Sequence, residues 1–183
     1  KKLLSILTLI AILVAVFYTV PVKAAETSHY NRLVTISKDG NWGYVYLCEY
    51  IDGDCQDDSC EEDIAIVDYR GNEAEVVIPE SVVTIGECAF AECDKLESIN
   101  LPAGLKEISF GLFRKCKALV NITLPSGIEK IGADAFAFCP ITEFTMPDSV
   151  KEIGGGIFTS CQKLASVTLS ENITAITDMM FYI

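Results

Sequence analysis

The stretch LESINLPAGLKEISFGLFRKC, residues 96–116, decides the fold, because LVNITLPSGIEKIGADAFAFC at residues 119–139 repeats its pattern 23 residues later. Two more copies follow, ITEFTMPDSVKEIGGGIFTSC from residue 141 and LASVTLSENITAITDMMFYI from residue 164. A further copy, AEVVIPESVVTIGECAFAEC, precedes them from residue 74. Self-similarity at a period of about 20–50 residues predicts an array of stacked structural repeats.

Four residue types keep one register through the copies. The proline step recurs at intervals of 23, 23, 22 and 23 residues, with Ser170 in the proline position of the last copy. The four columns are Pro79, Pro102, Pro125 and Pro147; Phe90, Phe113, Phe136, Phe158 and Phe181; Cys93, Cys116, Cys139 and Cys161; and Leu96, Leu119, Ile141 and Leu164. Columns that coincide in this way define one repeating unit.

Each unit begins with the alternating pattern of a half-buried strand, as in Ile99-Asn100-Leu101, and proline then ends the strand because it has no N–H to donate. A second short extended piece follows, and a glycine such as Gly132 leads into an expected helical turn that carries the Phe and the Cys. A single unit cannot bury its apolar face alone. Stacking of successive units buries it, which predicts a solenoid with one continuous core.

This unit resembles the BspA-like leucine-rich repeats of bacterial and protist surface proteins, which read LxxIxIPxxVxxIGxxAFxxC. The resemblance covers residues 75–183, and NWGYVYL with IAIVDYRGNEAEVVIPE looks like the β-hairpin that precedes the first unit in that family. It implies a right-handed leucine-rich repeat solenoid, mainly β with one short helical turn per repeat of about 23 residues. It also implies an exported or surface-attached interaction protein without catalysis, in some members an adhesin for host or matrix proteins.

The N-terminus has the features of a targeting segment. A basic start precedes an 18-residue, mostly apolar run from Leu3 to Val20, and Val22 and Ala24 occupy the small-residue positions of a cleavage site. We therefore expect a signal peptide at residues 1–24 and a secreted or cell-surface protein. The run is also just long enough to span a bilayer, so an uncleaved anchor is the alternative, and membrane contact is expected only through it.

The remaining chain divides into three parts. Residues 25–40 form an N-terminal segment, residues 41–74 a β-hairpin cap with an acidic cysteine-containing loop, and residues 75–183 about five repeats, the last incomplete. Cleavage after residue 24 would remove three lysines and no acid, leaving 11 basic against 26 acidic side chains and a net charge of −15. This charge repels nucleic acid phosphates, so we expect no nucleic acid partner.

Alternation along the first strand of each unit predicts an outward-facing row of small polar side chains. Neighbouring threonines on this face support the sheet, and the same face could dock a protein or glycan partner. The candidate face consists of Ser98, Asn100, Asn121, Thr123, Glu143, Thr145, Ser166 and Thr168.

On the second extended piece, the pairs Lys106-Glu107, Glu129-Lys130 and Lys151-Glu152 predict two charged columns of alternating sign that fix the register of stacking.

The stretch CEYIDGDCQDDSCEED, residues 48–63, carries eight acids and is expected to be an inserted loop. It departs from the EF-hand pattern, which has glycine at the sixth position and glutamate at the twelfth, because Asp57 and Asp63 stand there. Loose divalent binding by Asp52, Asp54, Asp58 and Asp63 and a simple solvated loop are both open readings. Cys55 and Cys60 could close a small disulfide, with Cys48 and Cys88 as other candidates, while zinc is disfavoured because paired C-x-x-C elements are absent.

The column cysteines are expected to be buried thiols that pack as small hydrophobic groups, because stacked side chains point in parallel rather than at each other. Cys88 lies outside this column; its equivalents are Gly111, Asp134 and Gly156. We find no catalytic constellation: His29 is the single histidine, and no phosphate-binding glycine motif occurs. The sequence therefore predicts a non-enzymatic chain without a cofactor.

Two hypotheses for function remain. The leading one is an exported recognition or adhesion module that presents its polar sheet face to a partner. The alternative is a structural stalk or spacer in a larger surface protein whose activity lies elsewhere. The sequence stops at MMFYI, where the fifth unit would present its cysteine, so we expect either a fragment or an end that pairs with another surface.

Overall fold

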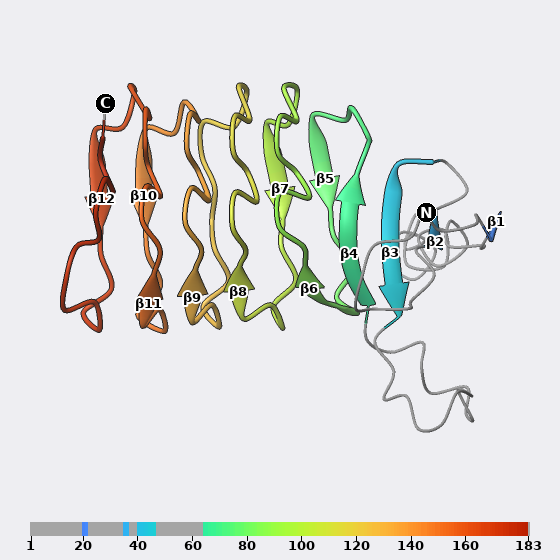
Figure 1. Ribbon diagram of the computed structural model, residues 1–183, viewed down its shortest axis with the longest axis horizontal. Helices are drawn as coiled ribbons and strands as arrows, with labels where there is room; N and C mark the ends of the chain where they lie inside the picture. The colour runs from blue at the N-terminus through green and yellow to red at the C-terminus, as the bar shows by residue number, and fades with distance from the viewer. Residues whose placement is uncertain (1–19, 22–34, 37–39, 47–63, 183) are drawn as a thin grey trace, which may run out of the picture.

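The repeats stack into a solenoid whose successive turns lie side by side along the long axis (Figure 1). The computed structural model describes residues 20–21, 35–36, 40–46 and 64–182. The predicted signal peptide therefore lies outside the described residues except at Val20–Pro21, and so does most of the N-terminal segment.

An antiparallel sheet covers the N-terminal end of the solenoid. Strand β1 (Val20–Pro21) pairs with β2 (Thr35–Ile36), β2 with β3 (Trp42–Tyr46), and β3 with β4 (Ile64–Tyr69). The β3–β4 pair is the hairpin that the sequence predicts. Strand β4 then pairs in parallel with β6 (Val82–Ile85), so the hairpin joins the first turn of the solenoid through backbone hydrogen bonds.

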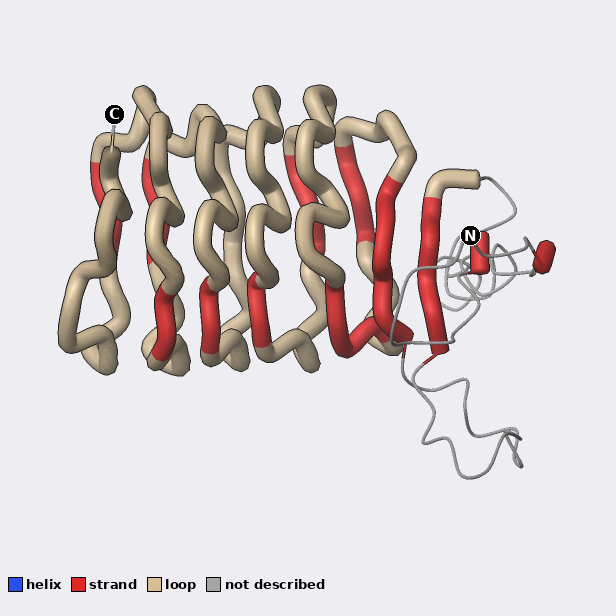
Figure 2. The backbone as a smooth tube through the Cα atoms, in the orientation of Figure 1, coloured by secondary structure: helices blue, strands red, loops and turns tan. Residues whose placement is uncertain are grey.

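Parallel strands run along two faces of the solenoid. The first face, which we call the main sheet, consists of two separate two-stranded sheets: β5 (Glu75–Val77) paired with β7 (Ser98–Asn100), and β10 (Glu143–Thr145) paired with β12 (Ser166–Thr168). The turn between these two pairs runs as irregular chain along the same face (Figure 2).

The second sheet lies across the core from the main sheet. It contains β8 (Glu107–Ile108), β9 (Lys130–Ile131) and β11 (Glu152–Ile153) in the order β11-β9-β8. The prolines connect the two sheets, because each proline carbonyl accepts the N–H of the third residue after it and so starts a turn. These bonds join Val82 to Pro79, Leu105 to Pro102, Ile128 to Pro125 and Val150 to Pro147.

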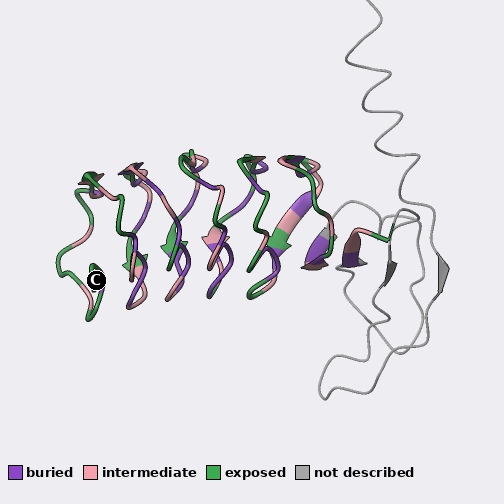
Figure 3. Cartoon of the chain, turned by 90° about the horizontal axis from the view of Figure 1, so that it is seen from above, coloured by how far each residue is buried: buried purple, intermediate pink, exposed green. Residues whose placement is uncertain are grey.

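The core is a set of stacked columns, seen as the buried inner side of each turn in Figure 3. The rings of Phe113 and Phe136 lie 5.7 Å apart and 9° from parallel, and those of Phe136 and Phe158 lie 5.9 Å apart. Phe90 begins this stack, and Tyr69 of β4 places its ring 4.8 Å from Phe90. The stack of aromatic rings therefore extends from the repeats into the hairpin.

The expected helical turn is not confirmed, since the described residues contain no helix. The Phe–Cys segment consists of successive hydrogen-bonded turns instead, such as Ala89 N–H to the Gly86 carbonyl and Ala91 N–H to the Cys88 carbonyl. Residues with positive φ interrupt a helix twice in each of the first four units and once in the last, because an α-helix requires negative φ throughout. They are Cys88, Gly111, Asp134, Gly156 and Met179 before the Phe, and Glu92, Lys115, Phe138 and Ser160 after it.

Glycine at the end of the second strand allows adjacent turns to approach closely. A Cβ on Gly132 would lie 2.6 Å from the backbone nitrogen of Phe110, and a Cβ on Gly154 would lie 2.2 Å from that of Ala133. These contacts are with backbone atoms, so side-chain movement cannot relieve them. The sequence pattern predicts turns at the same positions. The structure gives the reason why glycine stands there, namely the close approach of the backbones of adjacent turns.

We predict that Gly154→Ala destabilises the chain by about 1–3 kcal/mol or more, because the new methyl group would push two turns apart. The matched control is Gly104→Ala, where nothing lies within 4 Å of the added Cβ. The control should stay within about 0.5 kcal/mol of the wild type or be slightly more stable. Urea denaturation followed by circular dichroism measures both variants, and equal stability of the two would contradict the close-approach argument.

Candidate functional site

The outer face of the main sheet carries the residues that the sequence singles out. All eight side chains are exposed. In-register pairing places Ser98 beside Glu75, Asn100 beside Val77, Ser166 beside Glu143 and Thr168 beside Thr145. The structure thus brings the predicted residues onto one surface, which we call the polar face: Ser98, Asn100, Asn121, Thr123, Glu143, Thr145, Ser166 and Thr168.

Asn121 and Thr123 belong to this face although their segment is not a strand. The backbone N–H of Thr142 donates to the Val120 carbonyl at 3.1 Å, and the Thr142 hydroxyl donates to Asn121 Oδ1 at 3.3 Å. These bonds keep the third turn in line with the fourth. The pattern of strand residues alone could not show that two of the eight positions lie outside regular strands.

The polar face can form hydrogen bonds but offers little for catalysis. Its members are hydroxyl and amide side chains, with Glu143 as the single ionisable group. The apolar side chain of Val77 is 54% exposed beside Asn100, and Val120, which the sequence reasoning missed, is 38% exposed. Such a surface suits docking by hydrogen bonds with small apolar contacts at its edge.

The two charged columns pair across turns as their alternating signs predict. Lys130 Nζ lies 2.9 Å from Glu107 Oε1, and Lys151 Nζ lies 3.0 Å from Glu129 Oε2. The hydrogen bond and the positive charge of Lys151 lower the pKa of Glu129, and the corresponding contact with Glu107 raises the pKa of Lys130. Each pair is exposed, so it fixes register more than it adds stability.

The turns after the Phe column carry two further ion pairs that the sequence reasoning missed. Lys115 lies 2.6 Å from Glu92, and Lys117 lies 2.8 Å from Asp94. In both pairs the partners are 23 residues apart, so the repeat period itself is the signal that could have found them.

The column cysteines are free thiols that bond to the backbone of the preceding turn. Three of the four thiols donate to the carbonyl oxygen of the Phe one turn back: Cys116 to Phe90 at 3.1 Å, Cys139 to Phe113 at 2.9 Å and Cys161 to Phe136 at 3.1 Å. These three are buried and Cys93 is half-buried, so the expectation of four fully buried thiols is wrong for Cys93.

Burial protects these thiols to different degrees. It raises the pKa of both Cys93 and Cys161 to about 11, and the contact with the Cys139 thiol and burial together raise the pKa of Cys116. The hydrogen bond with Cys116 lowers the pKa of Cys139, so the protection of Cys139 rests on its burial alone. Because the thiolate is the reactive form, a raised pKa suppresses alkylation near neutral pH. Cys88, in contrast, is free and exposed.

The remaining candidate residues lie outside the described part of the chain. These are the possible cation ligands Asp52, Asp54, Asp58 and Asp63, and the possible disulfide partners Cys48, Cys55 and Cys60. Within residues 64–182 and the shorter described segments, no group of three or more His, Cys, Asp or Glu side chains could hold a metal ion. The same segments contain no helix long and apolar enough to cross a membrane.

Two exposed phenylalanines outside the Phe column were also overlooked by the sequence reasoning. Phe110 is 42% exposed and Phe138 is 44% exposed, and neither belongs to the Phe column of the core. The guanidinium carbon of Arg114 lies 5.6 Å from the centre of the Phe138 ring. A signal existed for Phe110, since its equivalents in the neighbouring units are Glu87, Ala133 and Gly155, none of them aromatic.

Comparison with known proteins places the chain in a family. Residues 69–183 match the BspA type leucine-rich repeat region in six copies, so the chain belongs to this family. The match begins at Tyr69, in agreement with the position of that ring at the start of the aromatic stack. No curated protein matches the sequence.

Several solved structures share the architecture. A leucine-rich repeat protein from Bacteroides ovatus is 43% identical over 52% of this chain and 25% of its own length, with a TM-score of 0.51. The leucine-rich repeat protein of T. pallidum is 28% identical over 86% of this chain and 77% of its own, with a TM-score of 0.59. The pneumococcal vaccine antigen PcpA, 23% identical over 80% of this chain and 31% of its own with a TM-score of 0.59, shares the fold. The chain spans about a quarter of the Bacteroides ovatus protein.

We predict that iodoacetamide at neutral pH labels Cys88 in the native chain and leaves Cys116, Cys139 and Cys161 unmodified, at rates roughly a hundredfold or more apart. Cys93 should react at an intermediate rate because it is half-buried. Peptide mass spectrometry after a time course resolves each site, and labelling in denaturant provides the control. Labelling of all five at one rate in the native chain would contradict the buried thiol column.

Proposed function

We propose that this protein is a non-catalytic recognition module that binds a partner protein through the polar face of its main sheet. The observation that supports the proposal is the row of exposed hydroxyl and amide side chains on consecutive turns, in register within the β5–β7 and β10–β12 pairs. Stacked repeats create extended surfaces of this kind, and solenoids commonly use them for binding.

The proposal includes the location of the protein, which we place at the cell surface. The apolar run and cleavage-type sequence at the N-terminus support export, and an exported solenoid with a polar surface fits a role in attachment at the cell surface. An adhesion role therefore accompanies the recognition function in our proposal.

We predict that three arginines on the polar face abolish capture of a specific partner. The test variant combines Asn100→Arg, Thr123→Arg and Thr145→Arg, which place bulky charged side chains on three adjacent turns. The control combines Ala103→Arg, Ser126→Arg and Gln162→Arg, three exposed positions off the face that change the net charge equally. Immobilised wild type, test variant and control are each exposed to envelope and host surface proteins, and captured proteins are quantified by mass spectrometry.

The proposal requires proteins that the wild type and the control recover and the test variant loses by at least about tenfold, since a disrupted interface centre typically costs more than 1.4 kcal/mol. Equal recovery by all three removes the polar face as the binding surface. Circular dichroism and urea denaturation establish that the variants remain folded.

A further inference from the structure

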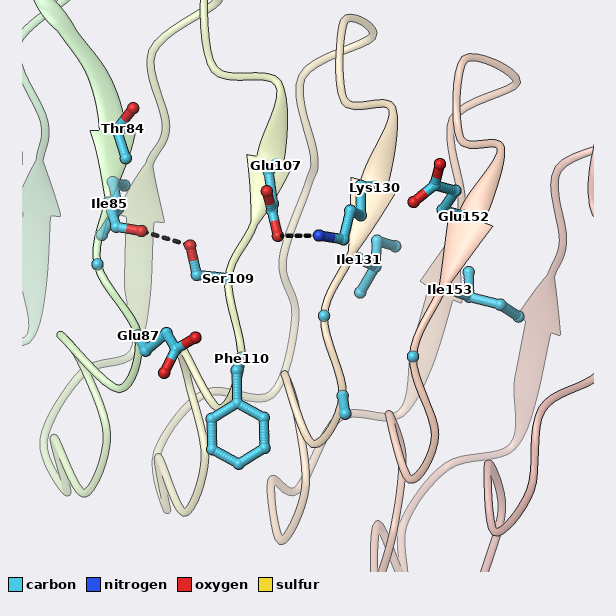
Figure 4. A pocket seen from close by; sticks show the side chains of 14 residues that line it. Thr84, Ile85, Glu87, Glu107, Ser109, Phe110, Lys130, Ile131, Glu152 and Ile153 are labelled. Carbon is cyan, nitrogen blue, oxygen red and sulfur yellow. Dashed lines mark hydrogen bonds and ion pairs between the residues drawn. The ribbon is translucent and has the colours of Figure 1, made fainter.

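The second sheet carries a hollow on the opposite side of the core from the polar face. It has a volume of about 490 Å³ and extends over four consecutive turns. Its walls come from the ends of β6, β8, β9 and β11 and from the glycine turns that follow them (Figure 4). Nothing in the proposed function uses this surface.

The hollow exists because small residues follow the second strand in most turns. Gly86, Gly132 and Gly154 occupy the first position after the strand, and Ala133 lies next to Gly132. Phe110 occupies the position equivalent to Ala133 in the preceding turn. The Phe110 side chain is larger than Ala133 at the equivalent position, and its exposed ring lines the hollow.

Acidic side chains outnumber basic ones in the lining of the hollow. Three carboxylates line the hollow, from Glu87, Glu107 and Glu152, against one cation, Lys130. The ion pair between Glu107 and Lys130 occupies the centre, with Glu87 near Phe110 on one side and Glu152 on the other (Figure 4). Neither Glu87 nor Glu152 forms an ion pair with another described residue.

Glu87 and Phe110 are neighbours because they hold the same position in adjacent turns. The Cys88 N–H donates to the Phe110 carbonyl at 2.9 Å, which fixes the two turns side by side. An exposed ring face next to a free carboxylate is the combination that attracts a guanidinium group, through cation–π attraction and charge-assisted hydrogen bonds. Arginine suits it better than lysine, because the planar guanidinium can stack on the ring while bonding to the carboxylate.

Glu152, which lies in register beside Lys130 but leaves the ion pair of that lysine to Glu107, sets the spacing of the ligand. Glu152 lies three turns from Glu87, and turns follow at about 4.8 Å, so the two acidic positions are roughly 12–15 Å apart along the solenoid axis. An extended peptide advances about 3.3 Å per residue, which places two basic side chains about four residues apart. The net charge of −12 further favours a cationic ligand.

We propose that this hollow binds an extended, arginine-containing peptide segment of a partner protein, with one arginine held between Phe110 and Glu87 and a second basic side chain at Glu152. The site is separate from the polar face. It gives the solenoid a second docking surface, selective for basic segments.

A labelled decapeptide with two arginines four residues apart in a Gly/Ser background tests the proposal, by fluorescence anisotropy with the full chain at about 50 and 150 mM salt. The same peptide with citrulline in place of arginine removes the charge and keeps the shape. We expect the arginine peptide to bind at least about tenfold more tightly than the citrulline peptide. Phe110→Ala should weaken binding about three- to tenfold, and Glu87→Gln and Glu152→Gln should each weaken it by a similar factor.

Matched controls separate this site from general attraction to an acidic protein. Phe138→Ala removes an equally exposed ring elsewhere, and Glu143→Gln removes a carboxylate from the polar face. Both should bind the arginine peptide as the wild type does, and so should the polar-face triple variant. The proposal is overturned if the wild type does not bind the arginine peptide, if both peptides bind equally, or if Phe110→Ala and Phe138→Ala have the same effect.

Discussion

Each turn of this protein must place its phenylalanine ring against the ring of the turn before it, and the rest of the structure depends on that contact. Rings of successive turns lie 5.7 to 5.9 Å apart from Phe113 to Phe181. A ring in this column has its aromatic partners mainly in adjacent turns, so a unit gains its core only by stacking. Three of the four cysteine thiols reinforce the arrangement, since each of the three donates to the carbonyl of a column phenylalanine one turn back.

The surfaces follow from the same register. When inward side chains are locked in columns, outward side chains form columns too, and these become the polar face on one sheet and the paired charges on the other. At Gly132 and Gly154, just after strands β9 and β11 of the second sheet, the backbones of adjacent turns approach closely. The hollow beside Phe110 is a consequence, because small residues that allow the turns to pack also leave space outside them.

Much of this organisation could be predicted from the sequence, because residues with the same structural role recur at the same position in every repeat. The prolines that end the strands and the outward polar residues lie where the alternation and the 23-residue period place them, and so do the inward Phe and Cys columns, except that Phe181 is exposed and Cys93 is half-buried. The hairpin before the first unit was expected from the resemblance to the repeat family, and the antiparallel pairing of β3 with β4 agrees with it.

Other features were not predictable, for physical reasons. The Phe–Cys segment has the composition of a helical turn, but the positive φ values at residues such as Lys115 and Phe138 carry no side-chain signature. Turn-to-turn contacts also decide exposure: Phe110 looks like a core residue by type, yet it faces the hollow, where the equivalent positions of the next two turns are the small residues Ala133 and Gly155. Contacts between units cannot be predicted when the sequence of each unit is considered alone.

The stability of a column variant tests the central claim most directly. Phe136 is fully buried, with ring contacts to Phe113, Phe144 and Phe158, whereas Phe138, two residues later, is 44% exposed. In urea denaturation, Phe136→Ala should lower the free energy of unfolding by about 3–5 kcal/mol, while Phe138→Ala should lower it by less than about 1 kcal/mol. Equal, small losses in the two variants would contradict a fold that depends on the stacked phenylalanine column.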